Sequence, residues 1–175
     1  MIISFSGYIA YDNSYNELLE SIITSSDDIE LMINSEGGDF ALAYSLYDLL
    51  IEKENQGFNI TTIAFGKVQS AAIIPFLAGK KRFAYPNVEF LIPEFMIQNF
   101  SLKFSNETII SSEFKSISDH IQFQTEKFIS LLKTKSNKTF QKMLDSKIDL
   151  FSGNDYFYSS EHMKEYGIVT KIIGV

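Results

Sequence analysis

The chain has no cysteine, only three prolines and only two histidines among its 175 residues. Without cysteine it cannot form disulfides or thiolate metal sites, which is compatible with an intracellular setting but does not prove one. The net charge is −7, and the sequence has no run of lysine and arginine. A protein that binds phosphate backbones needs clustered positive charge, so nucleic acid is not expected as the main partner.

Long apolar segments are also missing. The longest runs from Ala71 to Ala78, is interrupted by Pro75, and is far too short to cross a bilayer. The first residues, MIISFSGYIAYDN, lack the basic start and long apolar stretch of a signal peptide. We therefore expect a soluble, cytoplasmic-type protein that has no membrane partner.

Apolar side chains are abundant. They make up 45% of the chain, with 16 Phe and 9 Tyr, which is enough for one domain with a full core. The many aromatic residues have two interpretations that the sequence leaves open. They fill a large core, or some of them cover an interface between subunits, where aromatic residues are enriched.

Apolar runs and helical patterns alternate along the chain. Strands are predicted at Ile2–Ser6, Ile29–Ile33, Ile60–Phe65, Arg82–Tyr85, Val88–Ile92 and Ile168–Ile173. Helices are predicted at Asn13–Ile23, Asp39–Lys53, Ser70–Leu77, Ser112–Lys133, Ser136–Leu144 and Ser160–Tyr166. Loop signals occupy 34–38 and 66–69, and 101–112 is ambiguous. This alternation predicts an α/β fold with parallel strands.

Four segments resemble the proteolytic subunit of the Clp protease, a serine peptidase family. They are INSEGGDFALAYSLYDLL (33–50), FGKVQSAA (65–72), AGKKRFAYPN (78–87) and NDYFYSSEHMKEYGIV (154–169). The segments occur in the family's order and near its spacings, and the resemblance extends over roughly residues 2–173. Because fold does not fix function, it supports the fold more strongly than the chemistry.

The resemblance implies an α/β fold of the ClpP/crotonase type, a spiral of ββα units. A single domain would span 1–175, with a head at about 1–95 and 145–175 and a handle region at about 96–144. In the family the handle helix, here 112–133, joins two heptameric rings. The expected partners are further copies in a ring or double ring, or a catalytically complete paralogue. Docking of an unfoldase ATPase is in doubt, because Met1 falls at the first core strand and the family's axial segment has no counterpart.

The resemblance also assigns the residues of a site. Ser70 matches the nucleophile, and Asp155 matches the aspartate that orients the imidazole. Gly38 and Ala71 would supply the N–H groups of the oxyanion hole. Each residue has a simpler interpretation from its type: Ser70 as a helix N-cap, Gly37–Gly38 as a tight turn that needs positive φ, and Asp155 as a turn residue. Glu36 replaces the family's usual proline.

Pro93 occupies the position of the family's catalytic histidine. Proline has no ionisable group, so it cannot accept the proton of Ser70 or return it to a leaving amine. Neither His120, in the expected handle helix, nor His162 matches the histidine position. Lys67 lies three residues before Ser70, and alternation along an extended segment should point it away.

Pro75 is a second departure. At the fifth position of a helix starting at Ser70 it removes a backbone donor and presses on the Ala71 carbonyl, which would distort the turn or produce a tolerated kink.

Three functions therefore stay open. The first is an oligomeric peptidase homologue without standard proteolytic activity. The second is an active serine endopeptidase that uses a displaced base such as His120 or Lys67. The third is a crotonase-like acyl-binding protein, although no signature of an adenine-nucleotide pocket is present. No cofactor and no metal are expected.

Overall fold

A computed structural model of the chain describes residues 1–92, 107–146 and 156–174. The strands are β1 Ile2–Ile9, β2 Ile29–Gly38, β3 Ile60–Gln69, β4 Lys81–Ala84, β5 Glu89–Ile92, β6 Tyr156–Tyr158 and β7 Lys171–Ile172. The helices are α1 Asn13–Thr24, α2 Phe40–Asn55, the 3₁₀ turn η1 Ser70–Ala72, α3 Ile73–Phe76, α4 Glu107–Lys135, α5 Lys138–Ser146 and α6 Ser160–Glu165. The α/β class predicted from the sequence is confirmed.

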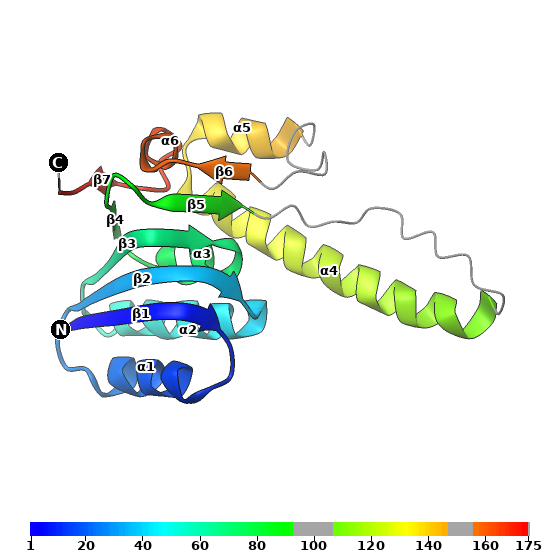
Figure 1. Ribbon diagram of the computed structural model, residues 1–175, viewed down its shortest axis with the longest axis horizontal. Helices are drawn as coiled ribbons and strands as arrows, with labels where there is room; N and C mark the ends of the chain where they lie inside the picture. Colours follow the sequence, from blue (N-terminus) through cyan, green and yellow to red (C-terminus); the bar gives the residue numbers. More distant parts are fainter. Residues whose placement is uncertain (93–106, 147–155, 175) are drawn as a thin grey trace.

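The strands form one sheet with the order β1-β2-β3-β4-β7. All of these neighbours pair in parallel. β3 pairs with β4 through its first half and with β5 through its second half, and β6 adds antiparallel to β5. The sheet therefore divides along the length of β3 (Figure 1).

Most predicted elements agree with the structure within a few residues. Asp39 caps α2, as expected, because its carboxylate accepts a hydrogen bond from the N–H of Leu42 at 2.9 Å. The two predicted loops were wrong, since 34–38 belongs to β2 and 66–69 belongs to β3. Both stretches are irregular strand, because the register of β2 shifts against each of its neighbours there. The strand β6 was not predicted, and β7 is shorter than expected.

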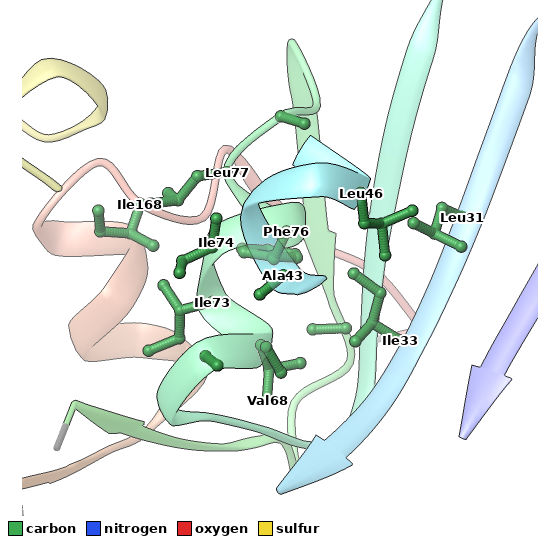
Figure 2. Close-up of a cluster of buried hydrophobic side chains, with 14 of the residues drawn as sticks. Leu31, Ile33, Ala43, Leu46, Val68, Ile73, Ile74, Phe76, Leu77 and Ile168 are labelled. Atoms are coloured by element: carbon green, nitrogen blue, oxygen red, sulfur yellow. The ribbon is translucent and has the colours of Figure 1, made fainter. Parts of the chain in front are cut away.

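The core lies between the sheet and the helices α1, α2 and α3. Figure 2 shows side chains from β2, β3, α2 and α3 that meet in one cluster, which includes Leu31, Leu46, Val68 and Phe76. Each of these four is at most 1% exposed. Because α3 follows the 3₁₀ turn directly, burial of its apolar residues fixes the end of β3 against the core.

Helix α4 extends away from the sheet (Figure 1). At its C-terminal end it packs on α2, where the rings of Phe128 and Phe40 meet edge to face with centroids 5.9 Å apart. The ammonium of Lys127 stacks on the ring of Tyr44 at 3.7 Å. Across the described residues, no helix has the length and apolar character that a bilayer span requires.

One buried cation joins four parts of the fold. Arg82, on β4, is 8% exposed. Its guanidinium donates to the carbonyls of Ile168 (2.6 Å), Gly79 (2.9 Å) and Gly167 (3.0 Å), with a longer contact to Lys135 (3.4 Å). These carbonyls belong to the exit of α3, the end of α4 and the connection from α6 to β7. Burial lowers the pKa of Arg82, and hydrogen bonds in place of water satisfy the buried charge.

Candidate functional site

Ser70 occupies a strained turn between β3 and the helix that follows. Gln69 is still extended, at φ −125° and ψ 148°, whereas Ser70 has a φ of +52°. Among the described residues it is the only non-glycine with positive φ. The left-handed conformation costs an L-residue about 1–2 kcal/mol, and such strain persists mostly at functional sites. The backbone thus turns sharply at the position that the sequence resemblance assigns to the nucleophile.

The interpretation of Ser70 as a helix N-cap was wrong. The capping position of the 3₁₀ turn is Gln69, and no side chain caps it. Within the described parts of the chain, no side chain lies within hydrogen-bond distance of the Ser70 hydroxyl. The serine therefore does not contribute the capping interaction that would explain its presence structurally.

The turn packs against two glycines at the end of β2. Gly37 has a φ of +101°, and a methyl group there would lie 2.8 Å from the carbonyl oxygen of Gln69 and from the Cβ of Ser70. Gly38 has a φ of +142°, and its methyl group would lie 2.2 Å from the carbonyl oxygen of Ile9. The predicted positive φ values are confirmed. Gly37 therefore allows close approach of Ser70, and Gly38 allows close approach of β1.

Side chains on β2 hold this pair of strands in place. The buried hydroxyl of Ser35 accepts a hydrogen bond from the N–H of Gly37 at 3.1 Å. The Asn34 carboxamide oxygen accepts from the N–H of Lys67 at 3.1 Å, where β3 carries extra residues relative to β2. Gly66, with φ +69°, lies against the same carboxamide. The asparagine thereby replaces a strand–strand hydrogen bond that the bulge interrupts.

The segment that contains Pro75 follows the turn. Residues Ser70–Ala72 form a 3₁₀ turn rather than an α-helix, and the N–H of Ile73 bonds to the carbonyl of Ser70. Since proline has no N–H, it cannot bond to the carbonyl of Ala71 four residues earlier. The structure instead has a tighter turn, in which backbone hydrogen bonds reach three residues back. The helix after Ser70 therefore starts in a 3₁₀ geometry, which sequence reasoning anticipated only as a distortion.

Charged and polar side chains on neighbouring strands form a row next to the turn. The Nζ of Lys67 lies 3.1 Å from a carboxylate oxygen of Glu36. This contact lowers the pKa of Glu36, mainly through a hydrogen bond and the charge of Lys67. Gln69 donates a hydrogen bond to Glu89 on β5. The ammonium of Lys67 is thus engaged by a carboxylate. The polar contacts of Gln69 were not anticipated, because long-range pairs have no local sequence signal.

The two histidines lie on helices α4 and α6. His120 is exposed on α4. His162 is exposed on α6, where its Nδ1 lies 3.3 Å from the hydroxyl of Ser159 and its ring packs edge to face on Tyr158. Pro93 and Asp155 lie outside the described residues. The structure thus brings together Ser70, Ala71 and the glycine pair, and it places neither histidine within hydrogen-bond distance of Ser70.

Metal coordination has no basis in the described part of the chain, where no three His, Asp or Glu side chains are grouped as ligands. Apart from Lys67, the polar groups described above around the turn are carboxylates, amides, a hydroxyl and backbone N–H groups. This set can bind and orient a carbonyl or a peptide. It offers no imidazole that could transfer a proton.

Comparisons with known proteins agree with the fold. The family model described as Clp protease matches residues 6–175. A solved structure of a ClpP1 point variant from Listeria monocytogenes superposes with a TM-score of 0.76 at 21% identity, covering 99% of this chain and 91% of that chain. The chain therefore belongs to the Clp protease family, and the ClpP-like fold predicted from the sequence is confirmed.

Proposed function

We propose that this protein is a ClpP-like serine peptidase homologue that has lost standard proteolytic activity and acts as a structural or regulatory subunit. One observation carries the proposal. Ser70 keeps a strained backbone turn at the position that the resemblance assigns to the nucleophile, while no described side chain is placed to accept its proton. The alignment of Pro93 with the family's histidine supports the same conclusion from the sequence.

The expected loss of rate is large. Removing a catalytic serine or histidine lowers kcat by about 10⁶ in a well-studied serine protease. The oxyanion hole and substrate binding alone leave an acceleration of roughly 10³–10⁴ over water. Gly38 and Ala71, as oxyanion donors, and Asp155, as the remaining triad residue, would then bind and orient a peptide without cleaving it at a useful rate.

Assembly into an oligomer is part of the proposal. Phe123 on α4 and Phe157 on β6 are 63% and 59% exposed. Large exposed aromatics of this kind are typical of protein interfaces, and α4 projects from the sheet where such contacts could form (Figure 1). The partner would be a second copy of this chain or a catalytically complete paralogue. An unfoldase ATPase remains a weaker candidate.

A fluorogenic peptide assay tests the loss of activity. We expect the purified protein to hydrolyse the peptide no faster than Ser70→Ala, because both lack a complete proton relay. Turnover that is robust in the natural chain and vanishes in Ser70→Ala would contradict the proposal. In that case a fluorophosphonate that labels Ser70, tested again in His120→Ala and Lys67→Ala, would identify the displaced base.

Restoring the missing histidine is the complementary experiment. If the remaining site is intact, Pro93→His should raise peptide hydrolysis above the natural chain, and the gain should disappear in the Pro93→His, Ser70→Ala double variant. A folded Pro93→His variant with no gain would shift the cause of inactivity to the 3₁₀ turn before Pro75. A thermal shift with acyl-CoA in the same preparations would favour the acyl-binding alternative instead.

A further inference from the structure

The strand β1 lies at the edge of the sheet and pairs only with β2 among the described strands. The N–H of Glu30 donates to the carbonyl of Met1, and the N–H of Asp39 donates to the carbonyl of Ile9, both at 2.9 Å. Odd-numbered residues of β1 therefore direct their backbone groups at β2. Since these directions alternate along a strand, the even-numbered residues direct their N–H and C=O groups at the free edge.

Nothing in the sequence of β1 protects this edge. The strand IISFSGYI contains no proline and no charged residue. Natural edge strands normally carry lysine, proline or an inward charge that blocks the addition of another strand. The backbone of β1 is therefore open to pairing along its regular part, residues 2–6, before the register shift between Ser6 and Tyr8 and the positive φ of Gly7, +112°.

A hollow of about 350 Å³ runs beside this edge, between β1 and α1. Ser4 and Ser6 of β1 line one side, and Ser14, Glu17 and Ser21 of α1 line the other. The helix runs along the free edge of the strand (Figure 1). The hollow thus offers serine hydroxyls and one carboxylate next to unpaired backbone donors and acceptors.

The charge of residues 1–52 indicates which kind of partner the hollow would bind. Residues 1–52 contain no lysine or arginine, and the neighbouring Lys53 is only 7% exposed, with its ammonium bound to the carbonyls of Ile23 and Ser25. They contain ten acidic residues, which are Asp12, Glu17, Glu20, Asp27, Asp28, Glu30, Glu36, Asp39, Asp48 and Glu52. Among the described residues that line the hollow, Glu17 alone is charged. A basic segment is attracted here, whereas the equally acidic edge of a second copy is repelled.

We propose that the edge of β1 binds an extended, basic peptide segment, which adds as a further strand and places a lysine or arginine side chain at Glu17. Backbone hydrogen bonds supply the affinity and the groove supplies the preference for charge, as in other cases of strand addition. This site is separate from Ser70, so it does not depend on the proposed function.

The first test is binding of a labelled ten-residue peptide of alternating lysine and valine, followed by fluorescence anisotropy. Two matched peptides serve as controls: one with glutamate in place of lysine and one with the alternate backbone nitrogens methylated. We expect saturable binding of the lysine peptide, weakened by salt, and little binding of either control. Equal binding of the methylated peptide, or no binding of the lysine peptide, would overturn the proposal.

The second test compares two substitutions at one position. Ser4→Pro removes an N–H that points to the free edge, so the β1–β2 pairing is kept. Ser4→Ala keeps that N–H. Because one hydrogen bond contributes about 0.5–1.5 kcal/mol, we expect Ser4→Pro to weaken peptide binding roughly two- to tenfold. Ser4→Ala should bind like the natural chain, and Glu17→Gln should reduce the preference for lysine over glutamate. Circular dichroism confirms that each variant folds.

Equal affinities of the folded Ser4→Pro and Ser4→Ala variants would refute strand addition at this edge. Native mass measurements without peptide address the other occupant. If Ser4→Pro dissociates an oligomer that Ser4→Ala retains, the edge pairs with a second copy, and the peptide proposal is wrong.

Discussion

Arg82 and Ser70 differ in how their polar side chains are bonded within the same fold. The guanidinium of Arg82 is buried, and each of its nitrogens donates to a backbone carbonyl. The hydroxyl of Ser70 has no partner among the described side chains, and its backbone is strained. Stability arises where buried polar groups are fully satisfied, whereas a strained residue whose side chain has no structural partner indicates a site retained for another purpose.

The largest loss of stability should come from removing the buried guanidinium of Arg82. Arg82→Ala leaves several buried carbonyls without donors, so we expect the free energy of unfolding to fall by about 3–5 kcal/mol. Urea denaturation followed by circular dichroism measures this loss. The exposed neighbour variant Lys81→Ala is the control and should change little. A small loss in Arg82→Ala would mean that water replaces the guanidinium, and the contrast with Ser70 would weaken.

Close packing around Ser70 can be separated from backbone strain by two glycines. Gly37 and Gly57 have almost the same φ, +101° and +100°, but a methyl group added to the Cα would have neighbours within 4 Å only at Gly37. Gly57→Ala should cost about 1–2 kcal/mol from its backbone conformation alone. Gly37→Ala should cost about 1–3 kcal/mol more, because its methyl group overlaps Gln69 and Ser70. Equal losses of unfolding free energy in the two variants, measured by urea denaturation, would show that the Ser70 turn accommodates the added methyl group without cost.

The strain at Ser70 predicts a gain in stability. Ser70→Gly should raise the free energy of unfolding by about 1 kcal/mol, since glycine adopts positive φ without the penalty of a Cβ. Ser70→Ala keeps the Cβ and should leave stability nearly unchanged. A Ser70→Gly variant that is no more stable than Ser70→Ala would remove the argument that strain is retained here.

The smallest effect concerns the ion pair next to the turn. Lys67→Gln should return the pKa of Glu36 towards its ordinary value of 4.5, measurable by NMR titration of the carboxyl carbon. Because the folded pKa lies below the unfolded one, the pair stabilises the fold above the unfolded pKa. That contribution disappears as pH falls through the folded pKa. Both side chains are about half exposed, so the unfolding midpoint at neutral pH should not change detectably. An unchanged pKa of Glu36 in Lys67→Gln would show that Lys67 is not what lowers it.

Local patterns in the sequence were sufficient for most of the fold. Helical spacing located α1, α2 and α6, and glycines marked the end of α2 and of α6. The extended parts of β2 and β3 were missed because Gly37 and Gly66 read as turn residues. Their strand conformation depends on pairing with neighbouring strands and on the carboxamide of Asn34, and no local pattern encodes those contacts.

The candidate site could be predicted only in part. The motif around Ser70 gave its position, and the glycine pair gave its positive φ values. The strain at Ser70 and the division of roles between Gly37 and Gly38 required three-dimensional packing. The backbone carbonyls that accept hydrogen bonds from Arg82 could not be predicted from the sequence either, because they lie up to 86 residues away along the chain.

The two glycines at the end of β2 contact two different parts of the fold. Gly38 touches Ile9 of the edge strand, while the adjacent Gly37 touches the turn at Ser70. Neither glycine has a side chain, so the backbones of the edge strand and of the Ser70 turn both lie close to consecutive residues of β2. The edge of the sheet and the turn at Ser70 are thus separated by the width of a single strand.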